Sequence, residues 1–144
     1  MSTPSTALGF ITMDLARFTL ISALPFLGLS IFYTLRFSTD PLFQAPDLPA
    51  GPTHTNYHAF RGGMLSIGVV VALVYMTFLI SPQDMHSYSW NLTAIVTAFY
   101  FVGWWLPGPL LRLGTPDRKA LINHILATAL TLLSLLLSKP YFYS

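Results

Sequence analysis

Four long apolar runs, separated by segments rich in proline, glycine and charged residues, make up most of the chain. They cover about residues 7–35, 62–80, 88–106 and 120–137. A bilayer-spanning helix needs about 20 mostly apolar residues, so each run is long enough to cross a membrane. Because apolar residues do not alternate with a period of two, the pattern predicts helices and not barrel strands. We therefore predict a single all-α domain over residues 1–144, an integral membrane four-helix bundle.

The connections between the runs differ in kind. The first, residues 38–61, contains four prolines within twelve residues, and because proline lacks a backbone donor we predict a long proline-rich loop there. The second, SPQDMHS, is predicted to be a tight turn. The third, residues 107–119, has proline and glycine followed by the helix-start signal TPD, and is predicted to be a loop before the last helix.

The composition agrees with a membrane protein and excludes several other classes. Only 8% of the residues are charged and the mean hydropathy is +0.61, whereas a soluble domain carries roughly 25% charged residues. The net charge of +2 is too small, and the basic residues too scattered, to predict binding of nucleic acid. The absence of cysteine excludes disulfides, thiolate nucleophiles and cysteine-ligated clusters.

The distribution of basic residues predicts an orientation. Those in the first and third connections are Arg36, Arg61, Arg112, Arg118 and Lys119. The opposite side carries Arg17 and Lys139. The positive-inside rule then places loops 38–61 and 107–119 in the cytosol and both termini on the other side of the membrane.

Two charged residues interrupt the first apolar run. Asp14 and Arg17 are three residues apart, which puts them on one face of a helix and allows an ion pair. Near the headgroups they would be an interfacial pair. Deeper in the bilayer, where a charge costs about 2.5–3.5 kcal/mol, they would face the bundle interior and be functional. The sequence leaves both placements open, and Pro25 is predicted to kink the same helix.

A second polar group precedes the second run. His54 and His58 are four residues apart and Arg61 follows, but two visible ligands are too few, so we predict no metal site and no cofactor. Small residues in the same run, Gly62 with Ser66 and Gly68 with Ala72, predict close packing of helices.

Three residues deeper in the runs are predicted to bind substrate: Tyr75, Tyr100 and His124. His124 is the only histidine inside an apolar run. Its neighbour Asn123 points about 100° away around the helix, so at most one of the two is expected to face the bundle interior.

Two segments, RGGMLSIG and TAFYFVGWWLPGPLLRLGTPD, carry a resemblance. They resemble an uncharacterised family of small four-helix membrane proteins, which have an Arg-x-x-Gly-Gly-type helix start and an Arg…Gly-x-Pro turn before the last helix. The matching residues are Arg61, Gly62, Gly63, Arg112, Gly114 and Pro116. Arg61 adjoins the glycines directly, which departs from the pattern. The resemblance covers residues 57–137 and implies a fold without an activity.

In size and topology the chain is also similar to small integral membrane enzymes of fungal polyketide and terpenoid pathways. That likeness implies cyclisation, oxygenation or epoxide opening as the kinds of chemistry to consider.

Two functions fit these observations. The first is a multi-pass membrane enzyme that acts on a lipophilic small molecule by acid–base chemistry without a redox cofactor, through isomerisation, cyclisation or epoxide opening. Asp14 would be its acid or base and Arg17 would stabilise an oxyanion, while His58 and Arg61 form a rival catalytic site. The alternative is a non-catalytic subunit or assembly factor of a larger membrane complex. The expected partners are the bilayer, a hydrophobic substrate, and copies of the chain or other membrane proteins.

Overall fold

Every regular element in the residues that the structure describes is a helix. The computed structural model describes residues 4–37, 39, 54–112 and 117–143. Its elements are α1 (Pro4–Phe37), α2 (His54–Val74), the π-helix η2 (Tyr75–Leu79), the 3₁₀ turn η3 (Pro82–Asp84), α3 (Ser87–Trp105), α4 (Pro107–Leu111) and α5 (Arg118–Phe142). The all-helical prediction is confirmed. Within the described residues, four segments are long and apolar enough to cross a membrane: Thr12–Phe37, Asn56–Leu79, Ser87–Leu111 and Arg118–Phe142.

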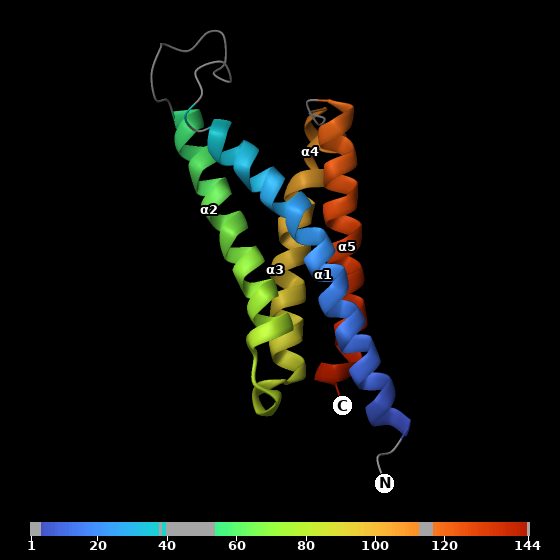
Figure 1. The fold of residues 1–144 in the computed structure, drawn as a ribbon. Helices are drawn as coiled ribbons and strands as arrows, with labels where there is room; N and C mark the ends of the chain where they lie inside the picture. Colours follow the sequence, from blue (N-terminus) through green and yellow to red (C-terminus); the bar gives the residue numbers. More distant parts are fainter. Residues whose placement is uncertain (1–3, 38, 40–53, 113–116, 144) are drawn as a thin grey trace.

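The long helices run up and down, and α1 crosses the bundle diagonally (Figure 1). α1 packs most extensively against α5 and next against α2, while α3 contacts both α2 and α5. In Figure 1 the start of α1, the end of α5 and the turn between η2 and α3 lie at one end. The predicted pairing of the termini with the second connection therefore agrees with the observed topology.

The buried face of α1 is a regular stripe. Met13, Ala16, Leu20, Ala23 and Leu27 are each at most 2% exposed, and their spacing of three and four residues places them on one side of the helix. The facing stripe of α5 is smaller and more polar; its buried residues are Asn123, Ala127, Thr131, Ser134, Leu135, Ser138 and Phe142. Small residues on α5 let the two helices approach closely.

Large apolar side chains point outward on every long helix. Phe18 is 68% exposed on α1, Leu65 67% on α2, Phe99 74% on α3 and Leu136 64% on α5. The outer surface of the bundle is thus apolar, while its core contains hydroxyl and amide groups. This distribution is the one expected for helices surrounded by lipid.

Side-chain donors from one helix bond to main-chain carbonyls of another. The Ser134 hydroxyl on α5 donates to the carbonyl of Ala16 at 2.8 Å. The Trp90 indole on α3 donates to the carbonyl of Leu135 at 3.0 Å. Similar bonds from Asn56, Arg17 and Asn123, described below, tie the other helices together.

Two predicted loop segments are in fact partly helical. Residues 54–61, predicted as loop, form the first two turns of α2, where the Asn56 amide donates to the carbonyl of Phe37 at 3.3 Å. That contact ties the polar start of α2 to the end of α1. Residues 107–111 form α4, because Pro107 at the first position of a helix loses no hydrogen bond. Arg112, with a φ of 57°, ends it. The four prolines of the first connection lie outside the described residues.

Among the glycines of α2, Gly63 lies closest to α1, and not the glycines expected from the sequence. A Cβ atom built on Gly63 would lie 2.5 Å from the Cδ2 atom of Leu35 on α1. Gly62 and Gly68 have no atom within 4 Å of such a Cβ. The close contact with α1 is therefore at Gly63, one position after the predicted Gly62.

Candidate functional site

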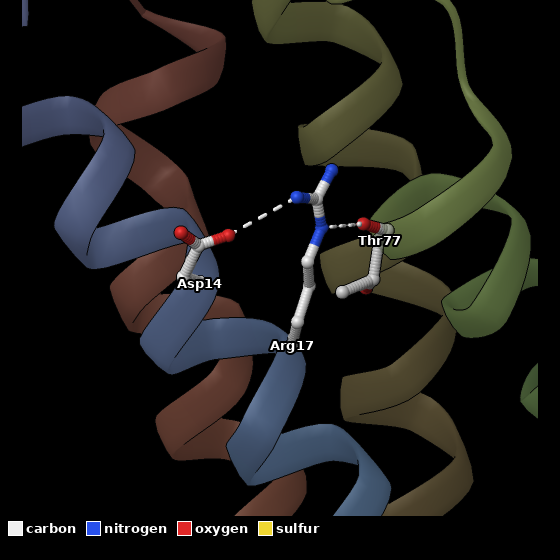
Figure 2. A network of polar contacts seen from close by, with 3 residues as sticks. All are labelled: Asp14, Arg17 and Thr77. Carbon is white, nitrogen blue, oxygen red and sulfur yellow. Dashed lines mark hydrogen bonds and ion pairs between the residues drawn. The ribbon is translucent and has the colours of Figure 1, made fainter.

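Arg17 joins α1 to the last turn of η2. Its Nη1 donates to Asp14 Oδ1 at 3.2 Å, and its Nε donates to the carbonyl oxygen of Thr77 at 3.1 Å (Figure 2). In the π-helical pattern this carbonyl would pair with the residue five positions on, which is Pro82 and has no N–H. The guanidinium therefore supplies the missing donor and places a positive charge at the carbonyl end of a helix.

The Asp14–Arg17 pair lies at the rim of the bundle. The side chain of Asp14 is 75% exposed and that of Arg17 is 39% exposed. Asp14 is ten residues after the start of α1 at Pro4, and Thr77 lies in η2, which ends at Leu79. The exposed Asp14 carboxylate therefore points away from the bundle interior.

His58 and Arg61 lie at the other end of the bundle. Both are exposed on the first turns of α2 and both contact the ring of Tyr57. The ring centroids of His58 and Tyr57 are 5.6 Å apart, and the Arg61 Cζ atom is 5.6 Å from the Tyr57 centroid. The side chain of His54 lies outside the described residues. No group of three or more metal-ligating side chains occurs in the part of the chain that the structure describes.

Two of the three predicted substrate-binding residues gather around Trp104. The ring centroid of Trp104 is 5.0 Å from that of Tyr100 and 4.3 Å from that of His124. We call Tyr100, Trp104 and His124 the aromatic cluster; it joins α3 to α5. The third residue, Tyr75, is 54% exposed on η2 and is outside the cluster.

Polar atoms of the aromatic cluster are buried without partners. The Tyr100 hydroxyl lies beside Ser66 of α2 and Trp104 but makes no hydrogen bond of normal geometry. The Nδ1 atom of His124 is also buried and unpaired. Such groups cost stability when unsatisfied, and the rings that carry these two atoms both contact Trp104.

The amide of Asn123 lies on the side of α5 that faces α1. It donates to the carbonyl of Phe26 at 3.0 Å and to the Ser30 hydroxyl at 2.7 Å, both on α1 next to Pro25. Asn123 is 9% exposed and its Oδ1 has no partner. Asn123 is buried against α1, whereas His124 is only partly buried and contacts Trp104 on α3. α5 thus has neighbours on two faces about 100° apart.

Sequence reasoning missed Trp104 and Asn123 as site residues. Trp104 follows Tyr100 by four residues, a spacing that places both rings on one helix face and could have revealed the contact. No sequence signal shows the Asn123 contacts, because one acceptor is a main-chain carbonyl on a distant helix.

Comparison with protein-family models, curated protein sequences and solved structures found no match. The resemblances noted from the sequence therefore stay predictions, and function is inferred from the site itself. The aromatic cluster offers an imidazole, a phenol and a flat indole surface within an apolar bundle. An imidazole and a phenol can accept and donate protons and can orient a polar group of a ligand.

Proposed function

We propose that the protein is a multi-pass membrane enzyme that acts on a lipophilic small molecule by acid–base chemistry at the aromatic cluster. The observation that carries the proposal is a pair of buried, unpaired polar atoms, Tyr100 Oη and His124 Nδ1. They belong to the two rings that contact Trp104. Insertion in a membrane is supported by the four apolar segments and by the outward-facing large side chains.

The chemistry follows from what each side chain supplies. His124 is proposed as the general base or acid, because imidazole exchanges protons readily near neutral pH. Tyr100 is proposed as the hydrogen-bond donor to a substrate oxygen, and Trp104 as the apolar surface on which the substrate lies. A polar group of the substrate would satisfy the two unpaired atoms, which favours binding. These roles suit isomerisation, cyclisation or epoxide opening, in which no electrons are exchanged.

The sequence-predicted catalytic residues receive other roles in this proposal. Arg17 caps η2 and Asp14 holds its guanidinium in place, so both act on the fold at the rim. His58 and Arg61 lie at the end that we propose faces the cytosol, in agreement with the positive-inside rule.

The test compares lipophilic extracts of cells that express the full chain or a variant. Untargeted mass spectrometry should detect an isomeric or hydrated product in wild-type extracts that disappears with His124→Asn and falls strongly with Tyr100→Phe. The matched control is His86→Asn, an exposed histidine in the turn before α3. A product that persists in the His124→Asn extract, with the variant present in membranes at normal level, would refute the assignment.

A second candidate function, a subunit of a larger membrane complex, is favoured by the sparse covering of α3. Only 11% of its apolar membrane-spanning stretch is buried, against 28–33% for the stretches of the other three helices. Purification in mild detergent distinguishes the two functions. Stoichiometric partner proteins would support the subunit, whereas an active preparation of this chain alone would rule it out.

A further inference from the structure

The two ends of the bundle differ in charge. Among the described residues, the end at which α5 begins carries Arg36, Arg61, Arg112, Arg118 and Lys119. The carboxylate described there is that of Asp117. The other end carries Asp14, Asp84, Arg17 and Lys139, two charges of each sign. Asp40 and Asp47 are in the first connection and, even if counted, do not balance five cations.

The cations at the start of α5 lie at the positive end of the helix dipole, which is unfavourable. Arg118 and Lys119 are exposed in the first turn, which has no acidic residue, where the N–H groups already give a partial positive charge. Asp117 is engaged as the N-cap, because its Oδ1 accepts from the Ala120 N–H at 2.8 Å. An anion from outside the chain would relieve this local excess of positive charge.

The short helix α4 lies at the same end of the bundle as these cations and supplies apolar surface there (Figure 1). Leu110 and Leu111 are 68% and 63% exposed, and the exposed Arg112 follows them directly. Trp105 ties the end of α3 to α5 ten residues beyond Arg118, since its Nε1 donates to the Thr128 hydroxyl at 3.0 Å. Exposed leucines next to arginine and lysine form a surface that suits both acyl chains and charged headgroups.

We propose that this α4–α5 corner, formed by Leu110, Leu111, Arg112, Arg118 and Lys119, binds an anionic phospholipid. The headgroup phosphate lies against the cations, and the upper acyl carbons contact the leucines. Charge complementarity selects this occupant, because basic residues at a membrane surface attract anionic lipids. The inference rests on the membrane insertion proposed above and does not depend on the aromatic cluster.

Native mass spectrometry of the full chain in detergent tests the proposal. Phosphatidylglycerol and phosphatidylcholine with identical acyl chains are added in turn, and the ratio of their apparent affinities is measured. Wild type should prefer phosphatidylglycerol. Arg118→Gln with Lys119→Gln should reduce the preference about thirtyfold, as expected for two basic residues near a membrane surface at about 1 kcal/mol each. The cap residue Asp117 is kept so that α5 still begins normally.

The matched control is Lys139→Gln, which removes a cation at the opposite end and should leave the preference unchanged. The single variants Arg118→Gln and Lys119→Gln, each checked for normal helical content, guard against misfolding of the double variant and should each show part of the loss. An equal loss in Lys139→Gln, or no preference in wild type, would overturn the proposal. Displacement of the lipid by inorganic phosphate would identify a general anion site instead, and would also overturn it. Each of these outcomes leaves the His124-dependent product as a separate readout of the proposed function.

Discussion

The cap that Arg17 places on η2 should contribute measurably to stability. Arg17→Met keeps an apolar stem and removes both hydrogen bonds. A bond from a charged donor to a carbonyl contributes about 1.5–3 kcal/mol, and an exposed ion pair such as that with Asp14 adds about 0–1 kcal/mol. Because the Arg17 side chain is 39% exposed, the low end of the first range applies. We expect the free energy of unfolding to fall by about 2 kcal/mol.

The assay is reversible unfolding of the purified chain in mixed micelles, followed by circular dichroism as the fraction of denaturing detergent rises. Asp14→Asn is the control, since it removes the ion pair and leaves the bond from Arg17 Nε to Thr77. Its expected loss is about 0.5 kcal/mol. Arg17→Lys should be intermediate, because one ammonium group replaces a fork whose two nitrogens point at two different acceptors.

Amide hydrogen exchange separates the cap from the ion pair. If the guanidinium secures the end of η2, Arg17→Met should speed exchange in the last turn before Ile80 while Asp14→Asn does not. A loss in Asp14→Asn as large as that in Arg17→Met would show that the ion pair, and not the cap, is the important contact. The reasoning above would then be refuted.

Three further substitutions test the helix contacts in the same unfolding assay. Asn123→Ala removes two buried hydrogen bonds, each worth about 0.6 kcal/mol between membrane helices, and should cost about 1–2 kcal/mol in all. Gly63→Ala forces Leu35 to move and should cost about 1 kcal/mol, whereas Gly68→Ala, where space is open, should be neutral. Trp90→Phe keeps a ring and loses the indole donor, so it should lower the free energy of unfolding by about 0.6 kcal/mol. An equal loss for both glycine variants would contradict the placement of the α1–α2 contact.

The helices themselves could be predicted because four apolar runs of bilayer length leave little choice of structure. The start of α2 could not, since its first two turns are polar and are tied to α1 through Asn56. The rim position of Asp14 was equally hidden, because it depends on how far along α1 the carbonyl of Thr77 lies. The Thr77 carbonyl has no main-chain donor in the π-helical pattern, because Pro82, five residues on, has no N–H.

The candidate site was predicted in part. Tyr100 and His124 were expected to line a binding site, and the structure brings them together through Trp104. Tyr75 was expected beside them but lies on the outer face of η2, because the rotation of that turn about its axis is set by π-helical geometry. The contacts of Asn123 with α1 and of His124 with α3 could be foreseen only by knowing that α5 has a neighbour on each side.

The bonds from side chains to main-chain carbonyls have a consequence for how the sequence can change. Their donors are Arg17, Asn56, Trp90, Asn123 and Ser134, and the acceptors belong to residues 77, 37, 135, 26 and 16. A carbonyl is present whatever residue carries it, so each contact constrains one of its two positions only. Substitution scanning should find the donors restricted and their partners permissive. The two positions of such a contact then have no reason to covary, and covariation between them would not reveal that these helices touch.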